Sequence, residues 1–185
     1  MSQGGIRLVA GRWRGHRLEV PPGIRPSEAR VREALLSIWG PDLEGARFLD
    51  LFAGSGAVGL EALGRGAAHV FLVDGGHASL QALRRNCRSL AGGGTLEGAT
   101  VLKGRLPCAL PAVAAVPCDL IFADPPYAWG DYGALMEAAK PWLAEGGELV
   151  IEHSGRSVIE APEPWRLSDE RRYGETRLSF FEKAI

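Results

Sequence analysis

The stretch "LDLFAGSGAVG", Leu49 to Gly59, predicts the fold of this chain. It lies between an apolar run, "RFLDLF", and a pattern typical of a helix. Its glycines are spaced G-x-G-x-x-G, and Asp74 ends the next apolar run 18 residues after Gly56 (74 − 56). A strand–turn–helix unit with these glycines and an acid at about this separation is typical of an adenosine-containing cofactor site, in which the acid accepts the ribose hydroxyls. If the glycines served only close helix–strand packing, the acid would have no role.

Strands and helices alternate from Arg47 onward. Apolar runs predict strands at 47–52, 69–74, 99–103, 118–124 and 148–153. Helical spacing predicts helices over Ala57–Leu63, Ala78–Leu90, Leu106–Val113 and Tyr132–Leu143. Continuous apolar strands are typical of parallel strands covered on both faces, so the fold class is α/β with a doubly wound, Rossmann-like sheet. The tail "WRLSDERRYGETRLSFFEK" predicts two further strands that add an antiparallel edge.

The first 40 residues have a different pattern. "IRLVA" and "HRLEV" flank "GRWRG", which predicts a β-hairpin. Ser27 is a candidate cap for a helix that continues through Val31 and Leu35 and ends at Gly40. We expect a single domain over 1–185, with an N-terminal extension at 1–40 and a cofactor-binding core at 41–185.

Composition narrows the class of protein. The 185 residues are 46% hydrophobic and 23% charged, close to the globular average. The sequence has no apolar run of the ~20 residues that cross a bilayer and no apolar signal-peptide core. We therefore expect a cytoplasmic protein that does not bind membranes. We also expect it to be a monomer. The histidines lack metal-ligand spacing, which argues against a metal site, and Cys87, Cys108 and Cys118 are expected to be reduced, mostly buried thiols.

Charge is unevenly distributed along the chain. The net charge is only −1, but residues 1–32 hold seven arginines against Glu19 and Glu28, which leaves the remainder at −6. A basic arm on an acidic body is typical of polyanion binding, although it also improves solubility. The candidate RNA-binding residues are Arg12, Trp13, Arg14, Arg17, Arg25, Arg30 and Arg32. The arginines would contact phosphates, and Trp13 would either stack on RNA or pack against the protein.

Asp50 indicates which cofactor the glycine loop holds. A carboxylate at the end of the strand would repel a pyrophosphate. S-adenosylmethionine (SAM) has no phosphate, and its sulfonium and amino groups are compatible with an acidic loop. The sequence therefore favours SAM over NAD, with Asp74 accepting the ribose hydroxyls in either case.

A second motif, "DPPY" at 124–127, follows the apolar run "CDLIFA". Proline fixes its own φ near −65° and restrains the preceding residue, so Asp124 is held in a set direction. This rigidity suits methylation of an exocyclic amine, whose lone pair is delocalised into the base. Asp124 and the Pro125 carbonyl would accept its N–H groups, and Tyr127 would stack on the base. A simple Asp-Pro turn with a packing tyrosine is the alternative.

The sequence resembles RsmD-type methyltransferases over nearly its whole length. The resemblance lies in "RLVAGRWRGHRLEVPPGIRPSEARVREAL", "FLDLFAGSGAVGLEALGRGAAHVFLVD", "DLIFADPPY", "GELVIEH" and "RRYGETRLSFF". It implies a class I SAM-dependent methyltransferase fold, with SAM as cofactor. It also implies that 16S rRNA or the small ribosomal subunit is the partner, and that the target is a guanine N2 at the position conventionally numbered 966. The arginine-rich opening is the part that separates this family from DNA adenine methylases.

The resemblance also implies roles for individual residues. The cofactor-binding residues are Asp50, Phe52, Ala53, Gly54, Ser55, Gly56, Asp74, Gly104 and Arg105. The catalytic residues are Asp124, Pro125, Pro126 and Tyr127. Four positions depart from the family pattern: Gly75 and Gly76 replace charged residues, Ala29 replaces an acid, and Arg105 lies where an acid would contact the adenine amine. Arginine has no acceptor for that amine.

Three other functions are compatible with parts of this pattern. The "DPPY" motif does not distinguish guanine from adenine, so a DNA or RNA adenine-N6 methyltransferase is the first alternative. An RNA-binding assembly factor with a decayed SAM site is the second, because of the departures at Arg105 and Gly75. An NAD oxidoreductase is the least favoured, since "DPPY" has no role in hydride transfer.

Overall fold

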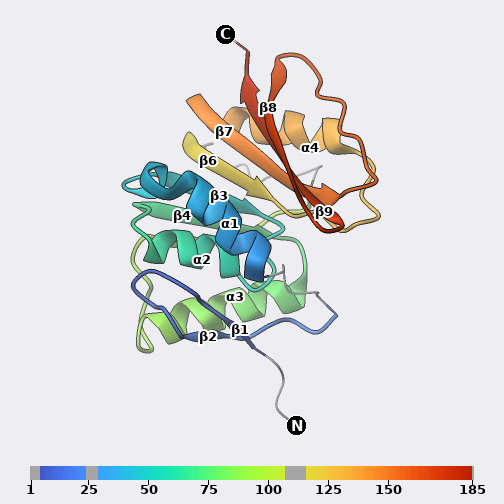
Figure 1. Cartoon of the computed structure of the whole chain (residues 1–185). Coiled ribbons are helices and arrows are strands. Elements are labelled where there is room, and N and C mark those ends of the chain that lie inside the picture. Colours follow the sequence, from blue (N-terminus) through green and yellow to red (C-terminus); the bar gives the residue numbers. More distant parts are fainter. Residues whose placement is uncertain (1–4, 24–28, 107–115, 185) are drawn as a thin grey trace.

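The computed structural model describes residues 5–23, 29–106 and 116–184. Its centre is a seven-stranded sheet in the order β5-β4-β3-β6-β7-β9-β8 (Figure 1). The strands are β3 (Arg47–Leu51), β4 (His69–Asp74), β5 (Ala99–Lys103), β6 (Cys118–Ala123), β7 (Leu143–Ser154), β8 (Trp165–Tyr173) and β9 (Thr176–Lys183). The first five are parallel, and β9 runs antiparallel to both β7 and β8. The α/β prediction with an antiparallel edge is confirmed.

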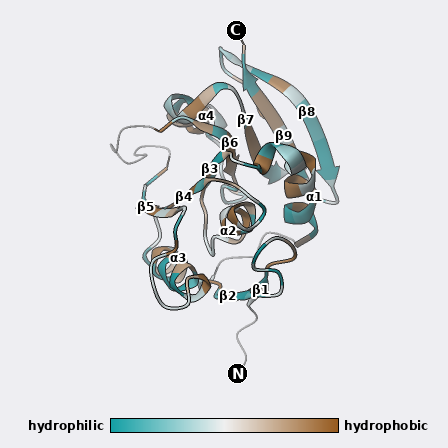
Figure 2. Cartoon of the chain, turned by 90° about the vertical axis from the view of Figure 1, so that its left-hand side faces the viewer, coloured by the Kyte–Doolittle hydropathy of each residue, from teal (hydrophilic) through white to brown (hydrophobic). Residues whose placement is uncertain are grey.

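Helices cover both faces of the sheet, and this explains why its strands are continuously apolar. The helices are α1 (Ala29–Trp39), α2 (Ala57–Gly64), α3 (His77–Leu90) and α4 (Tyr132–Ala139), with short 3₁₀ turns η1 (Gly40–Leu43) and η2 (Lys140–Trp142). Phe48 packs in a core with α1, α2 and α3, whereas the next residue, Leu49, packs in a second core with α4. Figure 2 shows brown apolar residues along the central strands and a mostly teal outer strand β8.

Two element boundaries differ from the sequence prediction by more than one residue. The last helix ends at Ala139 rather than Leu143, because Pro141 lies in the 3₁₀ turn η2. Strand β7 begins at Leu143 rather than Glu148, and an irregularity in its pairing with β6 accommodates the glycine turn at Gly146. The predicted helix over Leu106–Val113 and the Ser27 cap fall, apart from Leu106, outside the described residues.

The N-terminal hairpin packs against the side of the helices. Its strands β1 (Ile6–Arg7) and β2 (Arg17–Leu18) are only two residues long. Leu8 and Leu18 are buried in the same core as α1 and β3. At the tip, the Arg12 amide donates to the Gly64 carbonyl at the C-terminal end of α2 over 2.7 Å. In Figure 1 the parallel strands point to the right, and this tip lies on the left, at the opposite edge of the sheet.

Two negative findings apply to the described ranges. No helix in them is both long and apolar enough to span a membrane. They contain no group of three or more His, Cys, Asp or Glu side chains placed to hold a metal ion. Cys87 and Cys118 are free thiols, and burial raises their pKa values to about 11 and about 12. Cys108 lies outside the described residues.

Candidate active site

The glycine loop and the "DPPY" motif meet at the carboxyl edge of the sheet. Strands β3 and β6 are neighbours, with Leu51 opposite Ala123. The Asp124 amide donates to the Leu51 carbonyl over 3.3 Å, which ties the second motif to the strand that carries the first. Ligands of doubly wound sheets bind at this edge. The structure therefore brings together the two motifs that the sequence separates by about 70 residues (124 − 54).

The glycine loop has an unusual backbone. Phe52 has a φ of 63°, in the left-handed region, as do Gly54 and Gly56 at 56° and 80°. A bulky residue with this φ is uncommon, and such strain concentrates at functional sites. The Phe52 ring meets Trp129 edge-on, with their ring centroids 5.1 Å apart. The loop following β3 is thus braced against the segment following β6.

The Asp74 side chain binds backbone amides of the glycine loop and of the segment after β4. One carboxylate oxygen accepts the Gly54 amide at 2.9 Å, and the other accepts the Gly76 amide at 2.8 Å. Because each oxygen can accept more than one hydrogen bond, Asp74 retains capacity for ribose hydroxyls. The position predicted for the ribose acid is therefore at the loop, half-buried at the end of β4.

Asp50 lies beneath the loop rather than at its surface. Its side chain is buried and accepts the Gly59 amide at 2.9 Å, at the start of α2. A Cβ at Gly59 would collide with Leu72 and lie 3.1 Å from the Asp50 carboxylate, so a larger residue there would force these side chains to shift. Burial, together with the charges of Asp124 and Asp74, raises the pKa of Asp50 to about 8. Asp50 is therefore buried and largely protonated below pH 8, so the predicted repulsion of a pyrophosphate by Asp50 is not supported. The carboxylates of Asp74 and Asp124 lie at the same edge, which suits a cationic ligand.

We expect the stability of the protein to fall between pH 4 and pH 8 because of Asp50. Its pKa is raised in the folded state, so stability from this group is complete below the unfolded value of ~3.9 and lost as pH rises through about 8. Asp50→Asn has no charge to bury. Urea denaturation measures the free energy of unfolding of both proteins across this range. Relative to the wild type, the free energy of unfolding of Asp50→Asn should rise by up to ~1.4 kcal/mol per pH unit and level off above pH 8. Parallel stability curves would show that Asp50 is ionised throughout.

The "DPPY" motif presents Tyr127 to solvent from a fixed turn. Pro125 is buried and Pro126 is exposed, and the Pro126 carbonyl accepts the Trp129 amide at 2.7 Å. Tyr127 is 55% exposed, yet its hydroxyl lies 3.2 Å from the Thr176 hydroxyl at the start of β9. An exposed aromatic plane whose far end is anchored is suited to stacking on a base.

Sequence reasoning missed Asn86, which connects the glycine loop to the N-terminal extension. This buried amide on α3 donates to the Ser55 carbonyl at 2.8 Å and to the Glu19 carbonyl at 2.9 Å. It also accepts the Glu19 amide at 2.8 Å. Nothing in the sequence singles out this asparagine, because its partners lie 31 and 67 positions away.

The glycines that depart from the family pattern fit the local packing. A Cβ at Gly75 would lie 3.0 Å from the Gly104 carbonyl, and one at Gly76 would lie 3.1 Å from the Ser79 hydroxyl. The Gly104 amide donates to the Asp74 carbonyl at 3.1 Å, so the segment after β5 lies directly against the ribose acid. Arg105 is exposed beside it. The structure places Gly104 and Arg105 at the expected edge without identifying an acceptor for an adenine amine.

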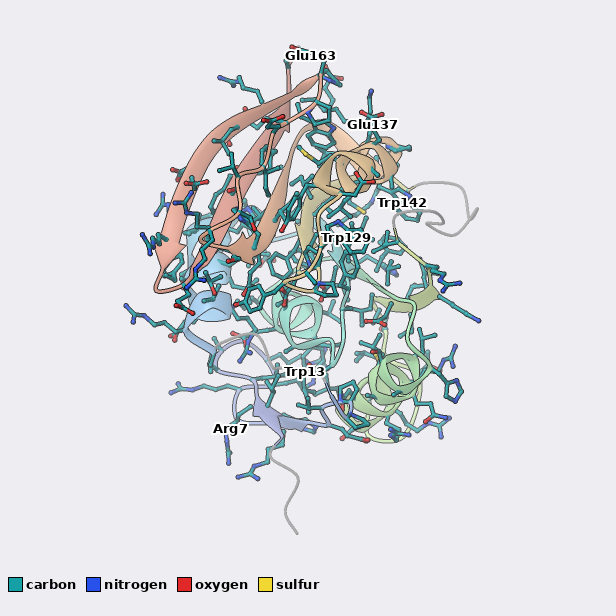
Figure 3. The ribbon with its side chains drawn as sticks, turned by 90° about the vertical axis from the view of Figure 1, so that its right-hand side faces the viewer. Arg7, Trp13, Trp129, Glu137, Trp142 and Glu163 are labelled. Carbon is teal, nitrogen blue, oxygen red and sulfur yellow. The ribbon has the colours of Figure 1, made fainter. Side chains whose placement is uncertain are left out.

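The predicted RNA-binding residues do not form one surface at this edge. Arg12, Arg14 and Arg17 are exposed along the hairpin. Trp13 is half-buried, packs 3.1 Å from the Cβ position of Gly64, and stacks under Arg12 at 5.2 Å. Figure 3 looks onto the carboxyl edge, with Trp129 near the centre and Trp13 on the hairpin well below it. Arg30 is exposed at the start of α1, and Arg25 lies outside the described residues.

The prediction for Arg32 is wrong, because its side chain is buried and already paired. Its Nε donates to Glu61 at 3.1 Å, with both side chains fully buried, and its Nη2 donates to the Arg7 carbonyl at 2.9 Å. Helical spacing placed this residue on the helix after the arm, but a charged residue in such a pattern gives no sign that it faces inward. Arg32 fastens α1 and the hairpin to α2.

Comparisons with known proteins show the family of this chain. The model of a family described as "Conserved hypothetical protein 95" matches residues 6–182. The chain belongs to this family. The resemblance to RsmD-type proteins is confirmed by "Ribosomal RNA small subunit methyltransferase D" of Escherichia coli (strain K12), which is 34% identical, with 98% of this chain and 92% of that protein covered. "Putative rRNA methyltransferase YlbH" of Bacillus subtilis is 32% identical over 96% of this chain and 99% of its own length.

Solved structures of similar chains have the same fold. "Putative methyltransferase yhhF from Escherichia coli" superposes with a TM-score of 0.82 at 34% identity and covers 97% of this chain and 98% of that chain. A Thermus thermophilus protein, TTHA0928, superposes with a TM-score of 0.78 at 34% identity, with 95% and 98% covered. The class I methyltransferase fold expected from the sequence is therefore confirmed.

Proposed function

We propose that the protein is an rRNA methyltransferase that transfers a methyl group from SAM to the N2 amine of a guanine in 16S rRNA. The observation that carries this proposal is the hydrogen bond that places Asp124 beside the glycine loop. The names of the relatives support an rRNA substrate. Guanine, and the position numbered 966, rest on the family resemblance.

SAM fits the residues at this edge. Asp74 would accept the ribose hydroxyls, and the backbone of Ala53 to Gly56 would lie against the cofactor. The carboxylates of Asp74 and Asp124 at this edge suit a ligand with cationic amino and sulfonium groups. SAM supplies the methyl group when bound.

The chain's own residues would prepare the base for this transfer. A target guanine would be flipped out of its stack, at a cost of a few kcal/mol. The Asp124 carboxylate and the Pro125 carbonyl would accept the N–H groups of its amine, which returns lone-pair density to the nitrogen. Tyr127 would stack on the ring and fix its plane. Most of the rate enhancement would then come from positioning.

We expect the Tyr127–Thr176 hydrogen bond to orient the base. Tyr127→Phe and Thr176→Val should each raise KM for the RNA a few-fold, because loss of one neutral hydrogen bond is worth ~0.5–1.5 kcal/mol. The double variant should be no worse than either single variant, and Thr176→Ser should restore activity. Steady-state kinetics on the four proteins measures this. Additive losses would mean that the two hydroxyls act independently.

Transfer of labelled methyl groups tests the substrate class. With purified protein and labelled SAM, we expect label in small subunits or in unmodified 16S rRNA transcript, and none in DNA. Label in DNA would favour an adenine-N6 methyltransferase. Titration calorimetry with SAM tests the assembly-factor alternative, since a decayed site would show no binding at millimolar cofactor.

A further inference from the structure

The turn between β8 and β9 lies next to the "DPPY" motif. Besides the contact between Tyr127 and Thr176, the Gly155 amide donates to the Glu175 carbonyl at 2.6 Å. Ser154 at the end of β7 is opposite Thr176, and Thr176 is opposite Tyr173. The end of β8 and the start of β9 are therefore fixed at the carboxyl edge, where the target base would enter.

This turn carries a cluster of positive charge. Arg172 and Arg177 are directly opposite each other on β8 and β9. Like charges in such a pair are destabilising, and within this pair Glu170 compensates Arg177 while Arg172 has no carboxylate partner among the described residues. The Nε of Arg172 lies 3.9 Å from the Cβ position of Gly155, next to the exposed Arg156. In Figure 3 nitrogen-tipped side chains surround the lower end of the β8–β9 hairpin.

Only some of these arginines are neutralised by the protein. Ion pairs tie Arg166 to Glu182, Arg171 to Asp169 and Arg177 to Glu170, at 2.8 to 3.0 Å. Within the described part of the chain, Arg156 and Arg172 form no ion pair with a carboxylate. Arg172 donates its Nε to the Gly174 carbonyl at 2.9 Å, which orients the guanidinium and leaves its two Nη groups for another acceptor.

We propose that Arg156 and Arg172 form a second RNA-backbone contact, separate from the one made by the N-terminal arm. This inference rests on the proposed function. A nucleotide whose base enters the site brings its flanking phosphates to the same edge, and arginine is suited to binding them bidentately. The hairpin arginines Arg12 and Arg14 lie near the other end of α2, so they would contact more distant parts of the RNA. The turn would hold the RNA close to the target base.

The test compares two double variants with the same loss of charge. Arg156→Gln/Arg172→Gln removes the two unpaired arginines, whereas Arg166→Gln/Arg171→Gln removes two arginines of β8 that are each paired with an acid. Binding of each protein to unmodified 16S rRNA transcript and to small ribosomal subunits is measured between 50 and 300 mM salt, with SAM affinity as a check on folding. Each phosphate contact contributes a slope of ~0.7 to 0.9 in log K against log salt.

We expect the first variant to bind RNA roughly 10-fold more weakly at ~0.15 M salt and to lose about 1.4 to 1.8 from the salt slope. The control variant should keep both values within about 2-fold of the wild type. Equal losses in both variants would assign the effect to overall charge and overturn the inference, as would wild-type binding by the first variant. Weakened binding to small subunits alone would place a ribosomal protein, not RNA, on this turn. If the wild-type protein binds neither substrate, the proposed function itself fails.

Discussion

Replacing Asp124 with alanine is expected to reduce methyl transfer to rRNA by roughly 10²- to 10³-fold, while SAM affinity stays within about 3-fold of the wild type. Preorganised acceptors and donors at reacting groups have effects of this size. Asp124 is half-buried at the end of β6, with its amide bonded to the Leu51 carbonyl, so its carboxylate is held beside the loop without forming part of it. The loss should therefore appear in kcat.

Three measurements separate this role from cofactor binding. They are kcat with saturating RNA, SAM affinity by calorimetry, and the same pair of values for Asp74→Ala. Asp74 accepts the amides of Gly54 and Gly76, so its loss should weaken SAM binding strongly. If Asp124→Ala loses SAM affinity to the same degree as Asp74→Ala, then Asp124 belongs to the cofactor site instead.

Glu61→Ala is expected to destabilise the protein by about 3–5 kcal/mol, because it leaves Arg32 as an uncompensated buried charge. Glu61 accepts from Arg32 at 3.1 Å, from Arg65 at 2.7 Å and from the Val9 amide at 3.2 Å. Its loss would release α1 and the hairpin from α2 together. The free energy of unfolding from urea denaturation measures this effect.

An exposed pair on another helix provides the control. Glu137 and Lys140 are 3.6 Å apart with side chains 51% and 40% exposed, so Glu137→Ala should cost no more than ~1 kcal/mol. Arg32→Met/Glu61→Leu should be much more stable than Glu61→Ala, since a buried pair can be replaced by apolar groups. A cost for Glu61→Ala as small as that for Glu137→Ala would mean that the network does not hold the extension in place.

Short-range patterns were sufficient to predict the sheet and the two motifs. Strand β3, the glycine loop and α2 are contiguous, and the carboxyl ends of parallel strands share one edge, so the meeting of the glycine loop and the "DPPY" motif follows from topology. The orientation of charged side chains does not follow from topology. Arg32 and Asp50 both carry charges that would ordinarily face solvent, and their burial depends on Glu61 and Gly59, which only the folded chain brings close.

The other site residues that the sequence did not predict act through long-range polar contacts. Asn86 and Thr176 have no distinguishing local pattern, and Thr176 in particular resembles an ordinary turn residue. Each acts through a partner tens of residues away, Ser55 and Tyr127 respectively. The charge surplus of the N-terminal arm was visible in the sequence, but the position of its hairpin near the far end of α2 was not. The division of the chain at residue 40 stays a prediction.

The central claim is that the edge containing Asp124 methylates the N2 amine of guanine. Small subunits or unmodified 16S rRNA are incubated with labelled SAM and either wild-type protein or Asp124→Ala, digested to nucleosides, and separated by mass. We expect the label in N2-methylguanosine with the wild-type protein and almost none with Asp124→Ala. Label in N6-methyladenosine, or equal label with both proteins, would contradict the claim.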